Sequence, residues 1–97
     1  MEIAQLEAFI LAADLGSFRR AADYLHLSQP SLSARIHSLE QELGVSLFHR
    51  MGRGVRLTEM GKLFLGYGEK TLSTLNQGKE AINSAMNASG GLSLIHI

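Results

Sequence analysis

The stretch SFRRAADYLHLSQPSLSARIHSLEQEL, residues 17–43, decides the fold. Apolar residues recur in it at spacings of three and four, which places them on one face of a helix. In its second half they fall within about 60° of one another when each residue turns the helix by about 100°. The pattern predicts a helix over 18–25, a three-residue turn at 26–28 and a helix over 29–42. The inner faces are Phe18, Ala21, Ala22 and Leu25 in the first helix, and Leu32, Ile36, Leu39 and Leu43 in the second.

Residues that start and stop helices flank both segments. Ser17 and Ser28 each precede a predicted helix, where a serine hydroxyl accepts a free backbone N–H. Pro30 lies in the first turn of the second helix, where its missing N–H costs little. Gly16 and Gly44 are expected to end the helices before them, because glycine readily adopts the left-handed backbone of a helix end.

The neighbouring segments extend this pattern. Residues 3–14 carry an apolar stripe that predicts a first helix. Downstream, Val45, Leu47 and Phe48 predict a short strand, and residues 55–57 alternate as a second strand. Between them lies the turn Met51-Gly52-Arg53-Gly54, whose two glycines are free to adopt positive φ. The expected product is a β-hairpin with an arginine at its tip.

A long helix is predicted over 59–88, with Thr58 as its N-cap and Glu59 at its positive end. Its apolar residues follow a heptad repeat, which favours pairing with a second copy of the chain. The alternative is ordinary packing within the chain. In the repeat, Leu65, Leu72, Lys79 and Met86 lie seven apart, and Gly68, Leu75 and Ile82 lie three residues after the first three of them. The residues predicted at the dimer interface are Leu65, Leu72, Leu75, Ile82 and Met86.

Charge is segregated along the chain although the formal net charge is +0. Every arginine lies between Arg19 and Arg56, every lysine lies at Lys62 or later, and residues 44–58 hold three arginines and no acid. A local basic stripe attracts a polyanion whatever the total charge; the alternative is a merely solvated surface.

The chain has no cysteine, no apolar run of membrane-spanning length and no basic residue among its first ten. We therefore expect a cytoplasmic protein.

Two helices joined by a short turn and followed by a basic hairpin are the layout of a winged helix-turn-helix, which is mainly α and binds DNA. The second helix of the pair is expected to enter the major groove, and the hairpin tip suits the minor groove. The residues predicted to contact bases are Gln29, Pro30, Ser33, Ala34 and His37. Those predicted to contact phosphates or to act in the wing are Ser17, Arg19, Ser31, Arg35, Ser38, Arg50 and Arg53.

The sequence also resembles the LysR-type transcriptional regulators of bacteria, from about residue 1 to residue 88 and most densely over 16–61. The resemblance is carried by the following segments in order: Gly16-Ser17-Phe18, Ala21-Ala22-Asp23-Tyr24-Leu25, Leu27-Ser28-Gln29-Pro30-Ser31-Leu32-Ser33, Ile36, Leu39-Glu40, Leu43-Gly44-Val45-Ser46-Leu47-Phe48-His49-Arg50 and Leu57-Thr58-Glu59-Met60-Gly61.

This resemblance implies a sequence-specific regulator that binds a dyad-symmetric operator as a homodimer or a dimer of dimers. It implies a DNA-binding domain over 1–58 and a linker and dimerisation helix over 59–88. Residues 89–97 are then either the start of an effector domain or a remnant of expression, and a chain without that domain is expected to bind no small-molecule inducer. One departure concerns position 34, which is often arginine in the family and is Ala34 here.

Other functions are less well supported by the sequence. His37 and Glu40 lie one helical turn apart, but a metal site needs three or four converging ligands, so we expect no metal and no cofactor. No nucleophile elbow or paired carboxylate is present, so we expect no enzyme. The remaining alternative is a protein-interaction or adaptor module that pairs through the long helix with full-length relatives.

Overall fold

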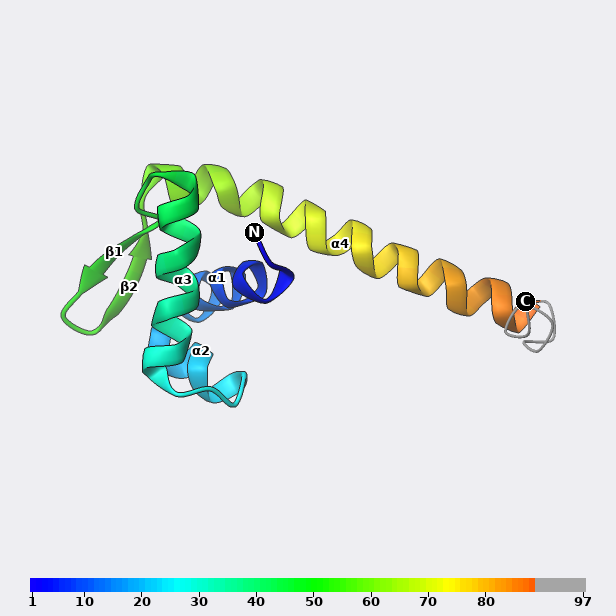
Figure 1. Ribbon diagram of the computed structural model, residues 1–97, viewed down its shortest axis with the longest axis horizontal. Helices are drawn as coiled ribbons and strands as arrows, with labels where there is room; N and C mark the ends of the chain where they lie inside the picture. Colours follow the sequence, from blue (N-terminus) through cyan, green and yellow to red (C-terminus); the bar gives the residue numbers. More distant parts are fainter. Residues whose placement is uncertain (89–97) are drawn as a thin grey trace.

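The computed structural model describes residues 1–88, and the expectations for residues 89–97 lie outside this range. Figure 1 shows three helices gathered into a head, a hairpin beside the third helix and a long fourth helix. The predicted fold class, a mainly α winged helix-turn-helix followed by a long helix, is confirmed. The elements are α1 (Ile3–Leu15), α2 (Phe18–Tyr24), α3 (Gln29–Leu43), β1 (Phe48–Met51), β2 (Gly54–Leu57) and α4 (Glu59–Ala88).

The predicted helix stops at Gly16 and Gly44 and the predicted caps at Ser17 and Ser28 are confirmed. Gly16 and Gly44 follow α1 and α3 in the left-handed conformation, with φ of 66° and 75°. The Ser17 hydroxyl accepts the backbone N–H of Arg20 at 3.1 Å, and the Ser28 hydroxyl accepts that of Ser31 at 3.2 Å. These capping bonds fix where α2 and α3 begin.

The turn between α2 and α3 differs slightly from the prediction. Helix α2 ends at Tyr24, so the connection runs over residues 25–28 and is one residue longer than expected. His26 takes the left-handed conformation there, with φ of 57°. Histidine is one of the non-glycine residues that tolerate this region, but nothing in the amphipathic pattern marks it.

The core lies where α1, α2 and α3 meet. The largest fully buried side chains are Phe9, Leu32, Ile36, Leu39 and Leu47. Aromatic rings join the helices to the hairpin, because the Phe48 ring centroid lies 5.5 Å from that of Phe9 and 5.2 Å from that of Phe18. Both pairs meet edge to face, the arrangement that aromatic quadrupoles favour. The first residue of the wing is thus part of the core of the head.

The hairpin pairs Phe48 with Leu57 and Met51 with Gly54, which leaves Gly52 and Arg53 as a two-residue loop. Arg53 at the tip is as predicted. The predicted strand over Val45–Phe48 is wrong in its start, because β1 begins only at Phe48. Of the two glycines that are free to adopt positive φ, Gly54 does so, with φ of 131°, and Gly52 does not.

The wing is fastened to the turn between α1 and α2. The backbone N–H of Val55 donates to the carbonyl of Gly16 at 3.1 Å. A Cβ on Gly54 would lie only 2.5 Å from that same carbonyl oxygen, so the close approach requires glycine. This contact sets the wing beside the N-terminal end of α2.

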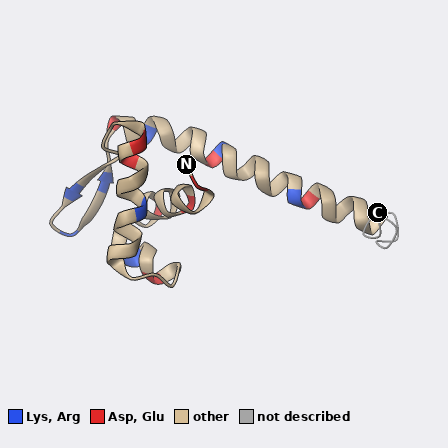
Figure 2. Ribbon diagram, in the orientation of Figure 1, with Lys and Arg blue, Asp and Glu red and all other residues tan. Residues whose placement is uncertain are grey.

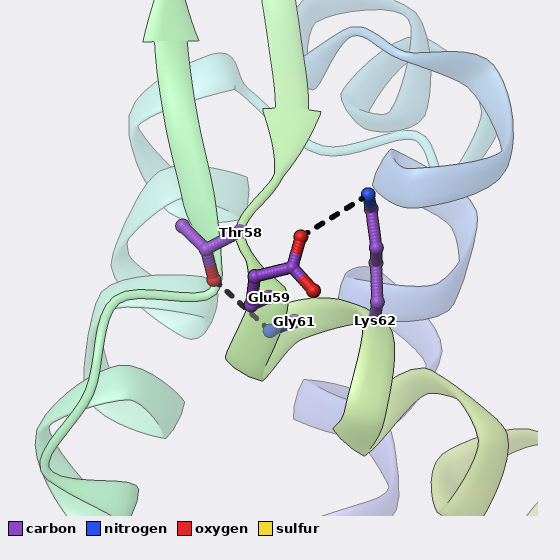
Figure 3. A network of polar contacts seen from close by, with 4 residues as sticks. All are labelled: Thr58, Glu59, Gly61 and Lys62. Atoms are coloured by element: carbon purple, nitrogen blue, oxygen red, sulfur yellow. Dashed lines mark hydrogen bonds and ion pairs between the residues drawn. The ribbon is translucent and has the colours of Figure 1, made fainter.

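Helix α4 starts from a cap that also closes the hairpin. The Thr58 hydroxyl accepts the N–H of Gly61 at 3.0 Å, as Figure 3 shows, and donates to the carbonyl of Ser46 at 2.7 Å. In the same turn, Lys62 pairs with Glu59 at 3.5 Å (Figure 3). The predicted cap is confirmed, and it ties α4 to the segment that leads into β1.

The first half of the heptad seam packs against the head of the same chain, in line with the alternative of ordinary packing. Leu65 and Leu72 are half-buried against the core of the head. Gly68 is buried, and a Cβ there would lie 3.0 Å from the Leu6 side chain of α1. A sequence repeat marks an apolar face but does not say which surface covers it. The predicted dimer interface of Leu65, Leu72, Leu75, Ile82 and Met86 stays a prediction.

The second half of α4 extends past the head (Figure 1). The principal extents of the described structure are 54 × 26 × 20 Å, and α4 runs roughly along the longest of them. Leu75 and Ile82 on this projecting part are 41% and 63% exposed. Over residues 1–88, no helix combines the length and hydropathy that crossing a bilayer requires.

Candidate nucleic-acid interface

Helix α3 buries one face and exposes the other, as the sequence predicts. Leu32, Ile36 and Leu39 on the inner face are all 0% exposed. On the outer face, Gln29, Pro30, Ser31, Ala34, His37 and Ser38 are exposed, while Ser33 and Arg35 on the two flanks are half-buried. The outer face is therefore free to meet a ligand, and the inner face fixes the orientation in which it is presented.

Predicted residues from three elements line one hollow between α3 and the wing. Ser17 and Arg19 come from the start of α2, Gln29 from the start of α3, and Arg50 and Arg53 from the hairpin. The Val55–Gly16 backbone bond holds the hairpin against the start of α2, and the Ser17 and Ser28 caps fix where α2 and α3 begin. A side chain suited to reading a base thus lies beside arginines suited to binding phosphate.

Arg50 does not simply point into solvent. Its guanidinium carbon lies 4.8 Å from the centroid of the Phe18 ring, within the range of a cation–π contact. Phe18 and Arg50 also line the next hollow along α3, which contains His37 and Gln41. Stacking on a core ring reduces the freedom of the long arginine side chain, so its charge is held between the two hollows.

A second group of predicted residues lies on the opposite flank of α3. Ala34, Arg35 and Ser38 line a shallow hollow with Glu2 and Gln5 at the start of α1. Ser31, in the first turn of α3, is exposed, and its hydroxyl oxygen lies 2.9 Å from that of Ser28. The predicted phosphate residues are thus divided between the two sides of α3, as a helix lying between two sugar–phosphate backbones requires.

Comparison with known proteins identifies the family. The model of the bacterial regulatory helix-turn-helix protein, lysR family, matches residues 3–62, which is more than half of the chain. The chain belongs to the lysR family. The predicted assignment to LysR-type DNA-binding transcriptional regulators is thereby confirmed, and regulators of this kind are not an enzyme family.

Individual relatives agree with this lysR assignment. An uncharacterized HTH-type transcriptional regulator in the ibpB-leuC intergenic region of Azotobacter vinelandii is 47% identical over 95 residues, which cover 97% of this chain and 66% of that protein. A probable RuBisCO transcriptional regulator of Trichormus variabilis is 45% identical over 91 residues, covering 94% of this chain and 27% of the relative. This chain thus spans between about a quarter and two thirds of the length of these two relatives.

A solved structure extends the likeness to three dimensions. The crystal structure of a CbnR_DBD–DNA complex has a TM-score of 0.82 and 36% sequence identity, and the match covers 88% of this chain and 98% of that one. At this identity and coverage, the chain shares its fold with that protein over most of its length.

Three basic residues of the head are not among the predicted site residues, although Arg56 is counted in the basic stripe. Arg20 is exposed in the first turn of α2, and His49 and Arg56 face each other across the hairpin, both exposed. All Lys and Arg positions on the hairpin are drawn blue in Figure 2, and none of its residues is acidic. The register of the hairpin places Arg56 opposite His49, and this register is the signal that would have found the pair.

The described residues do not assemble a metal site. No three His, Asp or Glu side chains converge within residues 1–88. His37 and Glu40, one turn apart on α3, line the same hollow, but a Glu40 carboxylate oxygen lies 2.7 Å from the backbone N–H nitrogen of Leu47, which donates to it. Glu40 therefore binds the chain itself, a role that the spacing on α3 did not predict.

Proposed function

We propose that this chain is the sequence-reading part of a bacterial transcriptional regulator and that it places α3 in the major groove of a DNA duplex. The observation that carries the proposal is the hollow between α3 and the wing, where Gln29 lies beside Arg50 and Arg53. The first turns of a recognition helix are where base edges are read in helix-turn-helix proteins. The CbnR_DBD–DNA complex is a DNA-bound chain of the same fold, which supports this use of the surface.

The residues divide by role. Gln29 can bind adenine through two hydrogen bonds, Ser33 and His37 can bond to base edges, and Pro30 and Ala34 can contact a thymine methyl group. Ser17 and Ser31 keep an O–H to donate to phosphate even where their oxygen accepts a bond within the chain. Arg19, Arg35 and Arg50 act on phosphates of the two flanking backbones with Ser38, while Arg53 at the tip enters the narrow minor groove. Since bacterial DNA lies in the cytoplasm, the proposed partner places the chain there.

Selection of bound duplexes from a random pool tests the proposal directly. We expect enrichment of one sequence with two half-sites related by dyad symmetry, and affinity for it that falls steeply with salt. Retention of all sequences alike would contradict base reading by α3.

Arg53→Ala is expected to weaken binding to all duplexes by a similar factor. Without the Arg53 charge about one phosphate fewer is neutralised near the minor groove, which lowers the slope of log affinity against log salt by about 0.9. Fluorescence anisotropy over a salt series measures this slope on the selected site and on an unrelated duplex. Lys70→Ala is the matched control, because it removes the same charge from an exposed position on α4. An equal change in slope for both variants would show that Arg53 makes no local contact.

We further propose that the projecting half of α4 pairs two copies of the chain. Leu75 and Ile82 continue the face by which Gly68 and Leu72 contact the head, but they are exposed. Isolated helices are marginal in water, so an unpacked apolar stripe favours association with another surface. Two copies joined in this way would present two α3 helices to the half-sites of a dyad.

Ile82→Asp is expected to shift the dimer equilibrium strongly toward monomer, because it places a charge in an apolar interface. We expect the dissociation constant measured by analytical ultracentrifugation to rise by about a hundredfold. Gln77→Asp serves as control, since it introduces the same charge at an exposed position on another face of α4. A parent chain that stays monomeric at tens of micromolar, as an order of magnitude, would contradict the pairing. A parent that dimerises but selects no DNA sequence would favour the adaptor function instead.

A further inference from the structure

Glu40 is an acidic residue on the wing side of α3, the flank that the proposed function turns toward DNA phosphates. It lines the hollow that also contains His37 and Arg50. A carboxylate so placed repels a phosphate backbone, and this repulsion weakens binding. Attraction to DNA therefore does not explain a glutamate at position 40, and another role for its side chain is required.

The contacts of Glu40 supply that reason. Its Oε2 accepts the backbone N–H of Leu47 at 2.7 Å and that of Phe48 at 3.4 Å. These two residues carry the chain from the end of α3 into β1, and the segment before Phe48 pairs with no strand. The side chain is half-buried, so these bonds are less exposed to competition from water than bonds on an open surface.

The base of the wing is held from the other side as well. The backbone N–H of Thr58 donates to the carbonyl of Leu47 at 2.9 Å, and the Thr58 hydroxyl donates to the carbonyl of Ser46. Leu47 is 0% exposed, so its side chain is anchored in the core. Of the residues that bind this segment, Glu40 belongs to α3 and Thr58 does not. Glu40 therefore joins α3 directly to the first strand of the wing.

We propose that Glu40 is a positioning residue for DNA binding, which sets the direction of the wing relative to α3. Through this link, Arg50 and Arg53 reach the backbone and the minor groove while Gln29 and Ser33 lie at base edges. The inference rests on the proposed function, and it adds that the reach of the Glu40 side chain, not its charge, is what binding requires.

Two conservative variants separate reach from charge. Glu40→Gln keeps the length of the side chain and an oxygen that can accept both N–H groups, whereas Glu40→Asp keeps the charge but is shorter by one methylene. We expect Glu40→Asp to weaken binding to the selected duplex by about tenfold, and Glu40→Gln to bind at least as tightly as the parent because a repulsive charge is gone. Glu42→Gln is the control, since the Glu42 carboxylate pairs with the amino group of Met1 at 3.1 Å and not with the wing.

A double-mutant cycle with Arg53→Ala distinguishes positioning from a general loss of stability. If Glu40 acts through the wing, Glu40→Asp costs about tenfold in the parent but a smaller factor once Arg53 is absent, because only Arg50 is then left to be misplaced. Circular dichroism and thermal melting of each variant report folding independently. An equal cost in both backgrounds, or a Glu40→Gln variant that binds as weakly as Glu40→Asp, would overturn the inference. Failure of the parent chain to bind any duplex would instead count against the proposed function.

Discussion

Replacing Gly54 with alanine is expected to detach the wing from the helix-turn-helix and to reduce DNA affinity by about tenfold or more. The added Cβ would lie 2.5 Å from the carbonyl oxygen of Gly16, and the φ of 131° at this position is one that alanine avoids. Backbone strain of this kind costs about 1–3 kcal/mol. Relief requires the hairpin to move, which breaks the Val55–Gly16 bond and carries Arg50 and Arg53 away from Gln29.

Gly52→Ala is the matched control for this variant. Gly52 lies in the same hairpin loop, but a Cβ there meets nothing within 4 Å and its φ lies outside the strained range. We expect Gly52→Ala to melt and bind like the parent, while Gly54→Ala shows both a lower Tm and weaker binding on the selected duplex. If Gly54→Ala bound DNA as tightly as Gly52→Ala, the docking of the wing on Gly16 would have no part in DNA binding.

The helices of this chain are predictable because local chemistry sets their ends. Gly16 and Gly44 stop helices by adopting positive φ, and Ser17 and Ser28 start them by accepting a backbone N–H. Each of these effects acts within about one turn of the chain, so the sequence around the residue contains all the information needed.

The start of the wing is not predictable in this way. Val45 and Leu47 suit a strand by composition, yet the N–H groups of Leu47 and Phe48 are bound by a carboxylate seven and eight residues earlier in the chain. The stacking of Arg50 on Phe18 and the close approach of Gly54 to Gly16 likewise join residues that are distant in sequence. Such contacts depend on the packed arrangement of several elements, which no single periodicity encodes.

The heptad on α4 shows a different limit. Its apolar face is real, but Leu65 and Leu72 turn this face toward the head of the same chain, whereas Leu75 and Ile82 leave it exposed. The periodicity predicts that one face of α4 packs against another surface, but it does not predict whether that surface belongs to the same chain or to a second one. A residue on this face of α4 is covered by the head only as far along the helix as the head extends. How far it extends depends on where α1 crosses α4, which is at Gly68.

Gln29→Ala is expected to remove discrimination at one base pair of each half-site. A bidentate contact to adenine contributes about 1–3 kcal/mol of discrimination, so we expect specific affinity to fall by about tenfold to a hundredfold. Binding to unrelated duplexes should stay nearly unchanged, because Gln29 carries no charge and the phosphate contacts remain. Competition assays against every single-base variant of the selected site measure the change position by position.

Gln41→Ala provides the control on the same helix. Gln41 is exposed like Gln29, but it lies near the C-terminal end of α3, about 18 Å further along the axis at 1.5 Å per residue. We expect its replacement to leave base preference intact, since side chains near the N-terminal end of a recognition helix are those that reach base edges. If Gln41→Ala altered preference and Gln29→Ala did not, the helix would lie in the groove with the opposite end inserted. If neither variant altered it, α3 would bind DNA without reading sequence through either glutamine, and specificity would have to come from the flanks and the wing.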